Sequence, residues 1–352
     1  MPPSRFRRAY TWGFLLLLFF SSVFVAWNSL QNGFGEFENS FYKRNDLIGL
    51  NNGLHLRLGD RVIQQALIGP DGWLNYSGDE NIEDFQRLSV FQNQTEILGG
   101  LAHLNQLLKS QNIRLLIVVT PNKPTIYPES MPPGLPPAQR PAKLDVFFAR
   151  LQAQGIDFVD LRPALREARL RHELYYKSDT HWNGYGAFAA YGAIVQKLQP
   201  DFPALPVLPE EKMTLTVTEP YQLEIPSMLI VTDMTEKRVD LTPPAGLAHS
   251  EHPEAYNEYD QFSWTANSQL PTLLMFHDSF GARYLDDDLS ASFAKSHFIH
   301  INSMSRNLSP ESLQKFQPDI LIIEIAERNL NKLILYFPEF MKINAPKFRL
   351  KD

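Results

Sequence analysis

The sequence predicts an α/β protein with a mostly parallel sheet and helices on both faces. Short apolar runs rich in β-branched residues recur along the chain, and such runs are typical of strands buried on both sides. Between them lie stretches whose apolar residues repeat at helical spacing, the pattern of parallel strands joined by crossover helices. With 352 residues and 44% hydrophobic content, the chain can bury a sizeable core.

The expected elements follow in chain order. Leu67–Leu74 contains a strand, a Pro-Asp-Gly turn and a second strand. Amphipathic helices are predicted over 97–108, 142–154 and 184–198. Gly155 is a suitable stop for the second helix, and the side-chain oxygen of Asn183 is a suitable N-cap for the third. Strands are predicted over 115–119, 156–161, 272–276, 298–301 and 320–325.

The N-terminus contains a candidate membrane span. Ala9–Trp27 carries no charge and follows Arg5, Arg7 and Arg8. About 20 apolar residues suffice to cross a bilayer as one transmembrane helix, and the basic flank predicts a cytoplasmic N-terminus with the rest exported. A cleaved signal peptide is the alternative, but Val23–Trp27 lacks a small-x-small cleavage site, which favours an uncleaved anchor.

This gives an expected organisation in four parts. A basic cytoplasmic tail (1–8) and the anchor (9–27) precede a juxtamembrane arm (28–90) and a main domain (91–345). Residues 201–265 interrupt the α/β alternation with prolines and charges, and we interpret them as an insertion, partly β, within the main domain.

Composition excludes several kinds of site. The chain has no cysteine, which rules out disulfides, thiolate zinc sites and a cysteine nucleophile. Its net charge is -6 and no basic stripe appears beyond the N-terminus, which argues against nucleic acid as the main ligand.

Two short motifs carry the chemistry. Asp179–Asn183 reads DTHWN, and His277–Gly281 reads HDSFG directly after an apolar run. A serine at the carboxyl end of a buried strand, with a histidine and an aspartate brought in from elsewhere, is a candidate nucleophile with its base and orienting carboxylate. Each motif alone also fits a helix cap or an ordinary loop, so the residues by themselves leave both interpretations open.

Four segments in order resemble the alginate O-acetyltransferase family of SGNH hydrolase-like proteins. Asp179–Asn183 resembles its Asp-x-His-Trp signature, and Asp71–Leu74 its early motif. Leu115–Tyr127, reading LLIVVTPNKPTIY, resembles its strand with Pro-x-Lys, and Ile322–Arg328, reading IIEIAER, its late strand. The resemblance spans about 70–340. It departs from the family pattern at His277, where a glycine is usual.

The resemblance implies a circularly permuted SGNH hydrolase-like catalytic domain with the histidine before the serine. It implies Ser279 as nucleophile, His181 as general base and Asp179 as orienter. It further implies an extracytoplasmic (periplasmic) enzyme on the bacterial inner membrane, a polysaccharide acceptor, and a multipass membrane acyltransferase as the acetyl donor. No metal or organic cofactor is implied.

Four further residues are candidates for substrate binding. Lys123 is placed to bind substrate or stabilise charge, with an exposed loop lysine as the alternative. Trp182 is suited to stacking on a sugar ring or to packing, and Tyr284 to lining the cleft or the core. Arg328 fits a substrate contact or an ion pair with a neighbouring glutamate.

Three functions remain open from sequence. The first is a membrane-anchored O-acetyltransferase acting on an exopolysaccharide or cell-wall glycan. The second is a carbohydrate acetylesterase with the same Ser-His-Asp triad, in which water takes the acyl group. The third is a non-catalytic polysaccharide-binding component of an acetylation or export complex.

Overall fold

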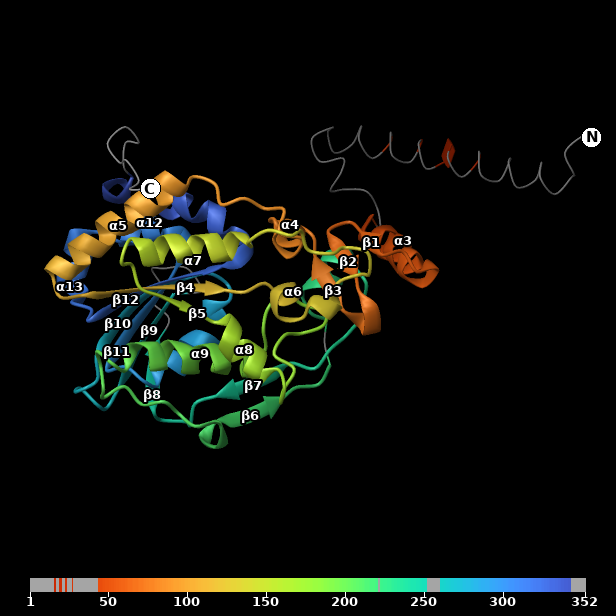
Figure 1. Ribbon diagram of the computed structural model, residues 1–352. Helices are drawn as coiled ribbons and strands as arrows, with labels where there is room; N and C mark the ends of the chain where they lie inside the picture. The colour runs from red at the N-terminus through yellow and green to blue at the C-terminus, as the bar shows by residue number, and fades with distance from the viewer. Residues whose placement is uncertain are drawn as a thin grey trace, which may run out of the picture.

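A mixed seven-stranded sheet forms the centre of the computed structural model (Figure 1). The structure describes residues 44–220, 222–251 and 260–342, together with isolated positions before residue 44. Five strands run parallel, and the last two pair antiparallel at one edge. Their order is β5 (Phe158–Asp160), β4 (Arg114–Thr120), β12 (Ile320–Ala326), β10 (Thr272–His277), β11 (Lys295–His300), β9 (Gln261–Thr265) and β8 (Ala248–Glu251).

Helices cover both faces of this sheet (Figure 1). Successive side chains of a strand point to opposite faces, so Leu116 and Val118 of β4 join one core cluster while Leu115 and Ile117 join the other. One face carries α5 (Gln94–Ser110), α7 (Lys143–Ala153), α12 (Met304–Asn307) and α13 (Pro310–Phe316). The opposite face carries α8 (Arg162–Ala168), α9 (Gly184–Leu198) and α11 (Asp286–Ser290).

The described part of the predicted arm forms a separate small layer. Helix α3 (Arg44–Leu58) precedes a three-stranded antiparallel sheet of β1 (Val62–Ile63), β2 (Ala66–Ile68) and β3 (Leu74–Tyr76). The short helices α4 (Asn81–Phe85) and α6 (Lys123–Ile126) lie near this layer (Figure 1). A third apolar cluster joins the layer to helix α10 (Glu224–Leu229) through Leu74, Ile225 and Leu229.

Residues 201–265 contribute four strands and α10. β6 (Thr214–Val217) and β7 (Val239–Thr242) form a two-stranded antiparallel sheet. β8 and β9 instead extend the central sheet, which makes it mixed rather than parallel throughout. The cap predicted for α9 is confirmed, because the Asn183 side chain accepts hydrogen bonds from the backbone N–H groups of Tyr185 and Gly186 at 3.0 and 3.2 Å.

The predicted span over Ala9–Trp27 lies almost entirely outside the described residues. Among the residues that are described, no helix combines the length and the apolar character needed to cross a bilayer.

Candidate active site

Ser279 and His181 meet at the carboxyl end of the central sheet. Ser279 lies just past β10, and His181 lies in the loop before α9. The Ser279 hydroxyl is 2.8 Å from His181 Nε2, and His181 Nδ1 is 2.7 Å from Asp179 Oδ1. His181 and Asp179 are buried, while Ser279 is partly exposed. The three side chains therefore form one continuous hydrogen-bonded path from a buried carboxylate to an accessible hydroxyl.

Asp179 is held as a carboxylate from several sides. Its Oδ1 also accepts the backbone N–H of His181 at 3.0 Å, and its Oδ2 accepts from the Arg283 guanidinium at 3.0 Å. Burial opposes the charge, but the hydrogen bond and charge of His181, together with Arg283, hold the pKa of Asp179 well below its usual range. The imidazole is therefore oriented by an ionised partner.

A second carboxylate reaches the same imidazole. Glu224, at the start of α10, places Oε2 3.3 Å from His181 Nδ1 and 2.5 Å from the Thr180 hydroxyl, which donates to it. Burial opposes its charge, yet the hydrogen bond and charge of His181 lower the pKa of Glu224. No sequence motif marks Glu224, because it lies in the irregular 201–265 stretch, far along the chain from the DTHWN motif.

The loop that carries Asp179 is fixed by three hydrogen bonds to one further carboxylate. Glu236, also from the 201–265 stretch, accepts from the backbone N–H groups of Lys177 and Ser178 at 3.0 and 2.9 Å. The Ser178 hydroxyl donates to the same carboxylate at 2.6 Å. The 201–265 stretch thus supplies both a carboxylate partner for the imidazole and the hydrogen bonds that hold its loop.

The turn that carries Ser279 is pinned to the end of β12. Asp278 accepts from the backbone N–H groups of Phe280 and Ala326 at 2.9 and 2.8 Å. Beneath it, Glu324 accepts from the Asp278 N–H at 2.9 Å and from the Thr120 hydroxyl at 2.7 Å. Burial, reinforced by Asp278, raises the pKa of Glu324 well above its usual range.

His277 supports the same turn from inside the protein. It is fully buried, and Nδ1 donates to the Asp278 carbonyl at 2.9 Å. Its Nε2 has no hydrogen-bond partner among the described residues. Burial lowers the pKa of His277 to about 4, which keeps the ring neutral. The ring packs against Gly281, where an added Cβ would lie 2.4 Å from the His277 Cβ.

A cleft of about 620 Å³ opens beside Asp179. Residues of the 201–265 stretch form one wall, and the turn after Ser279 forms the other. The polar groups that line it include Tyr176, Glu224, Arg238, Arg283 and Tyr284. The hydroxyls of Tyr176 and Tyr284 form a hydrogen bond at 2.9 Å. The Arg238 guanidinium lies over the Tyr284 ring, 5.1 Å from its centroid. Tyr284 thus lines the cleft from a largely buried position.

Lys123 lies inside the protein rather than on an exposed loop. Only 3% of it is exposed, and its ammonium lies 2.5–3.0 Å from the backbone carbonyls of Leu74, Tyr176, Lys177 and Asp179. Burial lowers its pKa to about 7. This position suits holding the Asp179 loop, and leaves no exposed face for substrate.

Trp182 and Arg328 lie on either side of Phe280. Trp182 is fully buried, and its indole N–H donates to the carbonyls of Phe280 and Arg283 at 3.2 and 3.1 Å, so it packs behind the site without a free ring face. The Arg328 guanidinium stacks over the Phe280 ring at 5.2 Å, and remains partly exposed near the site. The Phe280 ring also lies 4.7 Å from the ring of His181.

One group among the described residues is close enough together to hold a metal ion: Asp179, His181 and Glu224. Their possible ligand atoms all lie within 4.8 Å of one another. Both nitrogens of His181 already face protein partners, Asp179 and Ser279. The arrangement therefore fits proton transfer better than metal coordination, because a metal at Nδ1 would have to replace the Asp179 hydrogen bond.

One known protein family matches most of the chain. The profile described as "SGNH hydrolase-like domain, acetyltransferase AlgX" matches residues 66–327, well over half of the chain. The chain belongs to the AlgX family. The family resemblance predicted from the motifs is therefore confirmed, as is an SGNH hydrolase-like α/β fold, here with a mixed sheet.

Two curated relatives are each 27% identical to this chain. The chain is 27% identical over 173 residues to the probable alginate O-acetylase AlgJ of Pseudomonas aeruginosa, a match covering 49% of this chain and 38% of that protein. It is 27% identical over 283 residues to AlgJ of Azotobacter vinelandii, covering 75% of this chain and 69% of that protein. The match thus spans well under half the length of the first of these relatives.

A solved structure has a similar fold. A DHHW family protein from Eubacterium siraeum superposes with a TM-score of 0.59 at 15% identity, covering 79% of this chain and 98% of that one. At 15% identity, this similarity shows a shared fold and nothing about activity.

Proposed function

We propose that this chain is a membrane-anchored O-acetyltransferase that acetylates an exported or cell-wall polysaccharide through Ser279. The observation that carries the proposal is the path from Asp179 through His181 to the Ser279 hydroxyl, with links of 2.7 and 2.8 Å. Membership of an acetyltransferase family and two relatives called probable alginate O-acetylases support acetyl transfer over other acyl chemistry.

The reaction has two acyl-transfer steps. In the first, His181 Nε2 takes the Ser279 proton while Oγ attacks the acetyl carbonyl. The tetrahedral intermediate collapses, the donor's leaving group takes the proton from His181, and acetyl-Ser279 remains. In the second, a sugar hydroxyl gives its proton to His181 and attacks the acetyl group. Ser279 leaves and recovers the proton, which restores the site.

Charge is stabilised on both sides of the reacting atoms. Each step makes His181 an imidazolium, and the two carboxylates at Nδ1, Asp179 at 2.7 Å and Glu224 at 3.3 Å, favour that cation. The backbone N–H of Ser279 donates to no described acceptor, which leaves it available for the oxyanion.

The setting follows from the sequence. The basic flank and uncharged Ala9–Trp27 stretch would hold the catalytic domain on the outer side of a bacterial inner membrane. Acetyl groups activated in the cytoplasm must then cross the membrane, so we assign the donor role to a multipass acyltransferase partner. The 620 Å³ cleft with Arg238 and Arg283 is the proposed acceptor site.

The test is acetylation of Ser279 itself. The purified full chain is incubated with p-nitrophenyl acetate, an activated acetyl ester, and then with oligosaccharide acceptors. We expect mass spectrometry to find the acetyl group first on Ser279 and then on the acceptor, and Ser279→Ala to lose both products while keeping its melting temperature. Acetylated acceptor formed by Ser279→Ala at the native rate would refute the proposal, and acetate released with no acetylated acceptor would instead indicate an esterase.

A further inference from the structure

Helix α3 carries apolar residues on two opposite faces. Ile48 and Leu56 lie on the face that meets the domain, where Asn52 is buried and donates to the Leu229 carbonyl at 2.7 Å. Gly49 allows the close approach, since a Cβ there would lie 2.2 Å from the Ile230 carbonyl oxygen. This face is completed by the apolar cluster of the small layer.

The opposite face presents a leucine stripe to solvent. Its members are 52–73% exposed and recur at helical spacing: Leu47, Leu50, Leu54 and Leu58. Single exposed leucines are ordinary, but four in one row along a 15-residue helix form a contiguous apolar surface. A helix that is apolar on both sides is expected between two apolar partners, and the described residues supply one of them.

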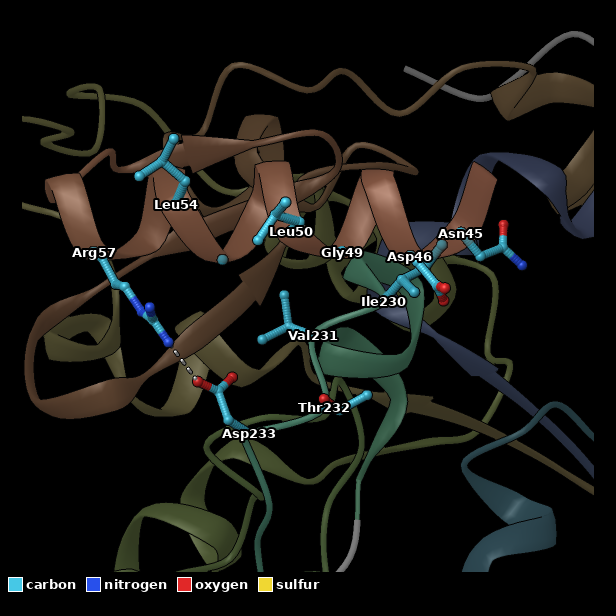
Figure 2. Close-up of a pocket in the computed structure, with 11 residues that line it drawn as sticks. Asn45, Asp46, Gly49, Leu50, Leu54, Arg57, Ile230, Val231, Thr232 and Asp233 are labelled. Carbon is cyan, nitrogen blue, oxygen red and sulfur yellow. Dashed lines mark ion pairs between the residues drawn. The ribbon is translucent and has the colours of Figure 1, made fainter. Parts of the chain in front are cut away.

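A hollow of about 670 Å³ borders this stripe (Figure 2). Leu50 and Leu54 line it together with Ile230 and Val231 of the segment that follows α10. In Figure 2 Val231 points toward the helix, and the ion pair between Arg57 and Asp233, at 3.7 Å, closes one end. The apolar surface therefore continues from the stripe onto the neighbouring segment.

We propose that the leucine stripe of α3 lies in the interfacial layer of the lipid bilayer and seats the domain on the membrane. Only residues 28–43 separate α3 from the uncharged Ala9–Trp27 stretch, so an extended connection reaches at most about 55 Å. Arg57, 80% exposed beside the stripe, is long enough to keep its charge at the headgroups while its stem lies on lipid. The proposal rests on the anchoring part of the proposed function and is independent of the chemistry at Ser279.

The absence of cysteine makes a direct test possible. Leu54→Cys in the stripe and Leu215→Cys on β6 are matched, at 54% and 50% exposed, and β6 lies away from α3 in Figure 1. Each full-length variant is spin-labelled and reconstituted in vesicles of phosphatidylethanolamine and phosphatidylglycerol. Relaxation by dissolved oxygen, which concentrates in lipid, is compared with relaxation by a water-soluble nickel chelate.

We expect the Leu54 label to gain oxygen accessibility and lose nickel accessibility relative to the Leu215 label. Equal accessibility at the two positions overturns the proposal. Low accessibility to both reagents, with or without spin–spin broadening, also overturns it, and indicates a protein partner or a second copy. Flotation of the same vesicles tests the anchor separately: protein that stays at the bottom refutes both anchoring and the proposal, while acetylation of Ser279 tests the chemistry alone.

Discussion

At the scale of single residues, the sequence identifies groups whose partners are close in the chain. Asp179 and His181 are two residues apart, and the short side chain of Asp179 reaches the ring at 2.7 Å. Glu224 reaches the same ring at 3.3 Å from the 201–265 stretch, where no local pattern marks it. The local motif therefore reveals one carboxylate partner of the imidazole, Asp179, whereas the second, Glu224, is evident only from the tertiary structure.

Glu224→Gln tests this second carboxylate. The amide can still accept from the Thr180 hydroxyl, but the negative charge at His181 Nδ1 is lost. We expect kcat to fall roughly tenfold, in the range for a hydrogen bond to a charged group, with KM little changed.

The control is Glu210→Gln, which removes a carboxylate 2.9 Å from His172 Nε2, outside the site. We expect native kinetics for this variant. If Glu224→Gln lowers thermal stability but leaves kcat unchanged, Glu224 only holds the loop.

At the scale of elements, the sequence predicts strands and helices well where they are long and periodic. Each helix and strand predicted between 97 and 325 is present, with ends shifted by at most three residues. The largest shifts are at the starts of α5 and β11, and β11 begins at Lys295 because polar residues there pair with β9 and β10. The order of strands was not predictable, because it depends on contacts between distant segments. The role of His277 at the end of β10 is likewise visible only once its neighbours are in place.

His277 predicts a pH dependence of stability. The pKa of its buried ring is lowered to about 4, against about 6.5 in an unfolded chain. Between these values the unfolded state binds more protons, so stability falls as pH drops below about 6.5 and levels off below about 4. Between pH 7.5 and pH 5, protonation of this one side chain in the unfolded state should lower the free energy of unfolding by about 2 kcal/mol. In His277→Asn, where the amide can still donate to the Asp278 carbonyl, that contribution disappears.

The measurement is the free energy of unfolding in urea at both pH values. The loss between them should be smaller by about 2 kcal/mol in His277→Asn than in the native chain, even though the smaller side chain lowers stability at both. His103→Asn on α5, which replaces an exposed histidine, should keep the native loss. An unchanged loss in His277→Asn would mean that the ring is solvated or charged in the folded protein.

At the scale of the whole molecule, distant segments converge on buried polar groups that the sequence presents as surface residues. Lys123 lies between Asn122 and Pro124, and the sequence makes it a candidate for binding substrate or stabilising charge, with an exposed loop lysine as the alternative. In the structure its ammonium joins the carbonyl of Leu74 on β3 to three carbonyls of the loop that ends at Asp179. Trp182 is similarly a candidate sugar platform in sequence and a buried contact in the fold. Burial depends on the assembled layers, so no local pattern distinguishes these alternatives.

Lys123→Met tests whether this contact holds the small layer and the catalytic loop together. Methionine keeps the apolar stem of the side chain but removes the ammonium that donates to four carbonyl oxygens. Of these, the Lys177 carbonyl still accepts from the Leu74 backbone N–H at 2.8 Å. We expect the free energy of unfolding to fall by about 3 kcal/mol, and acetylation of Ser279 to slow because Asp179 is no longer held in place. Lys109→Met is the matched control, since Lys109 is exposed and bonds only the Gly155 carbonyl, at 3.4 Å, so it should change stability by about 0.5 kcal/mol or less. A Lys123→Met variant as stable as the control, but with a raised KM for the acceptor, would return Lys123 to the role of substrate ligand.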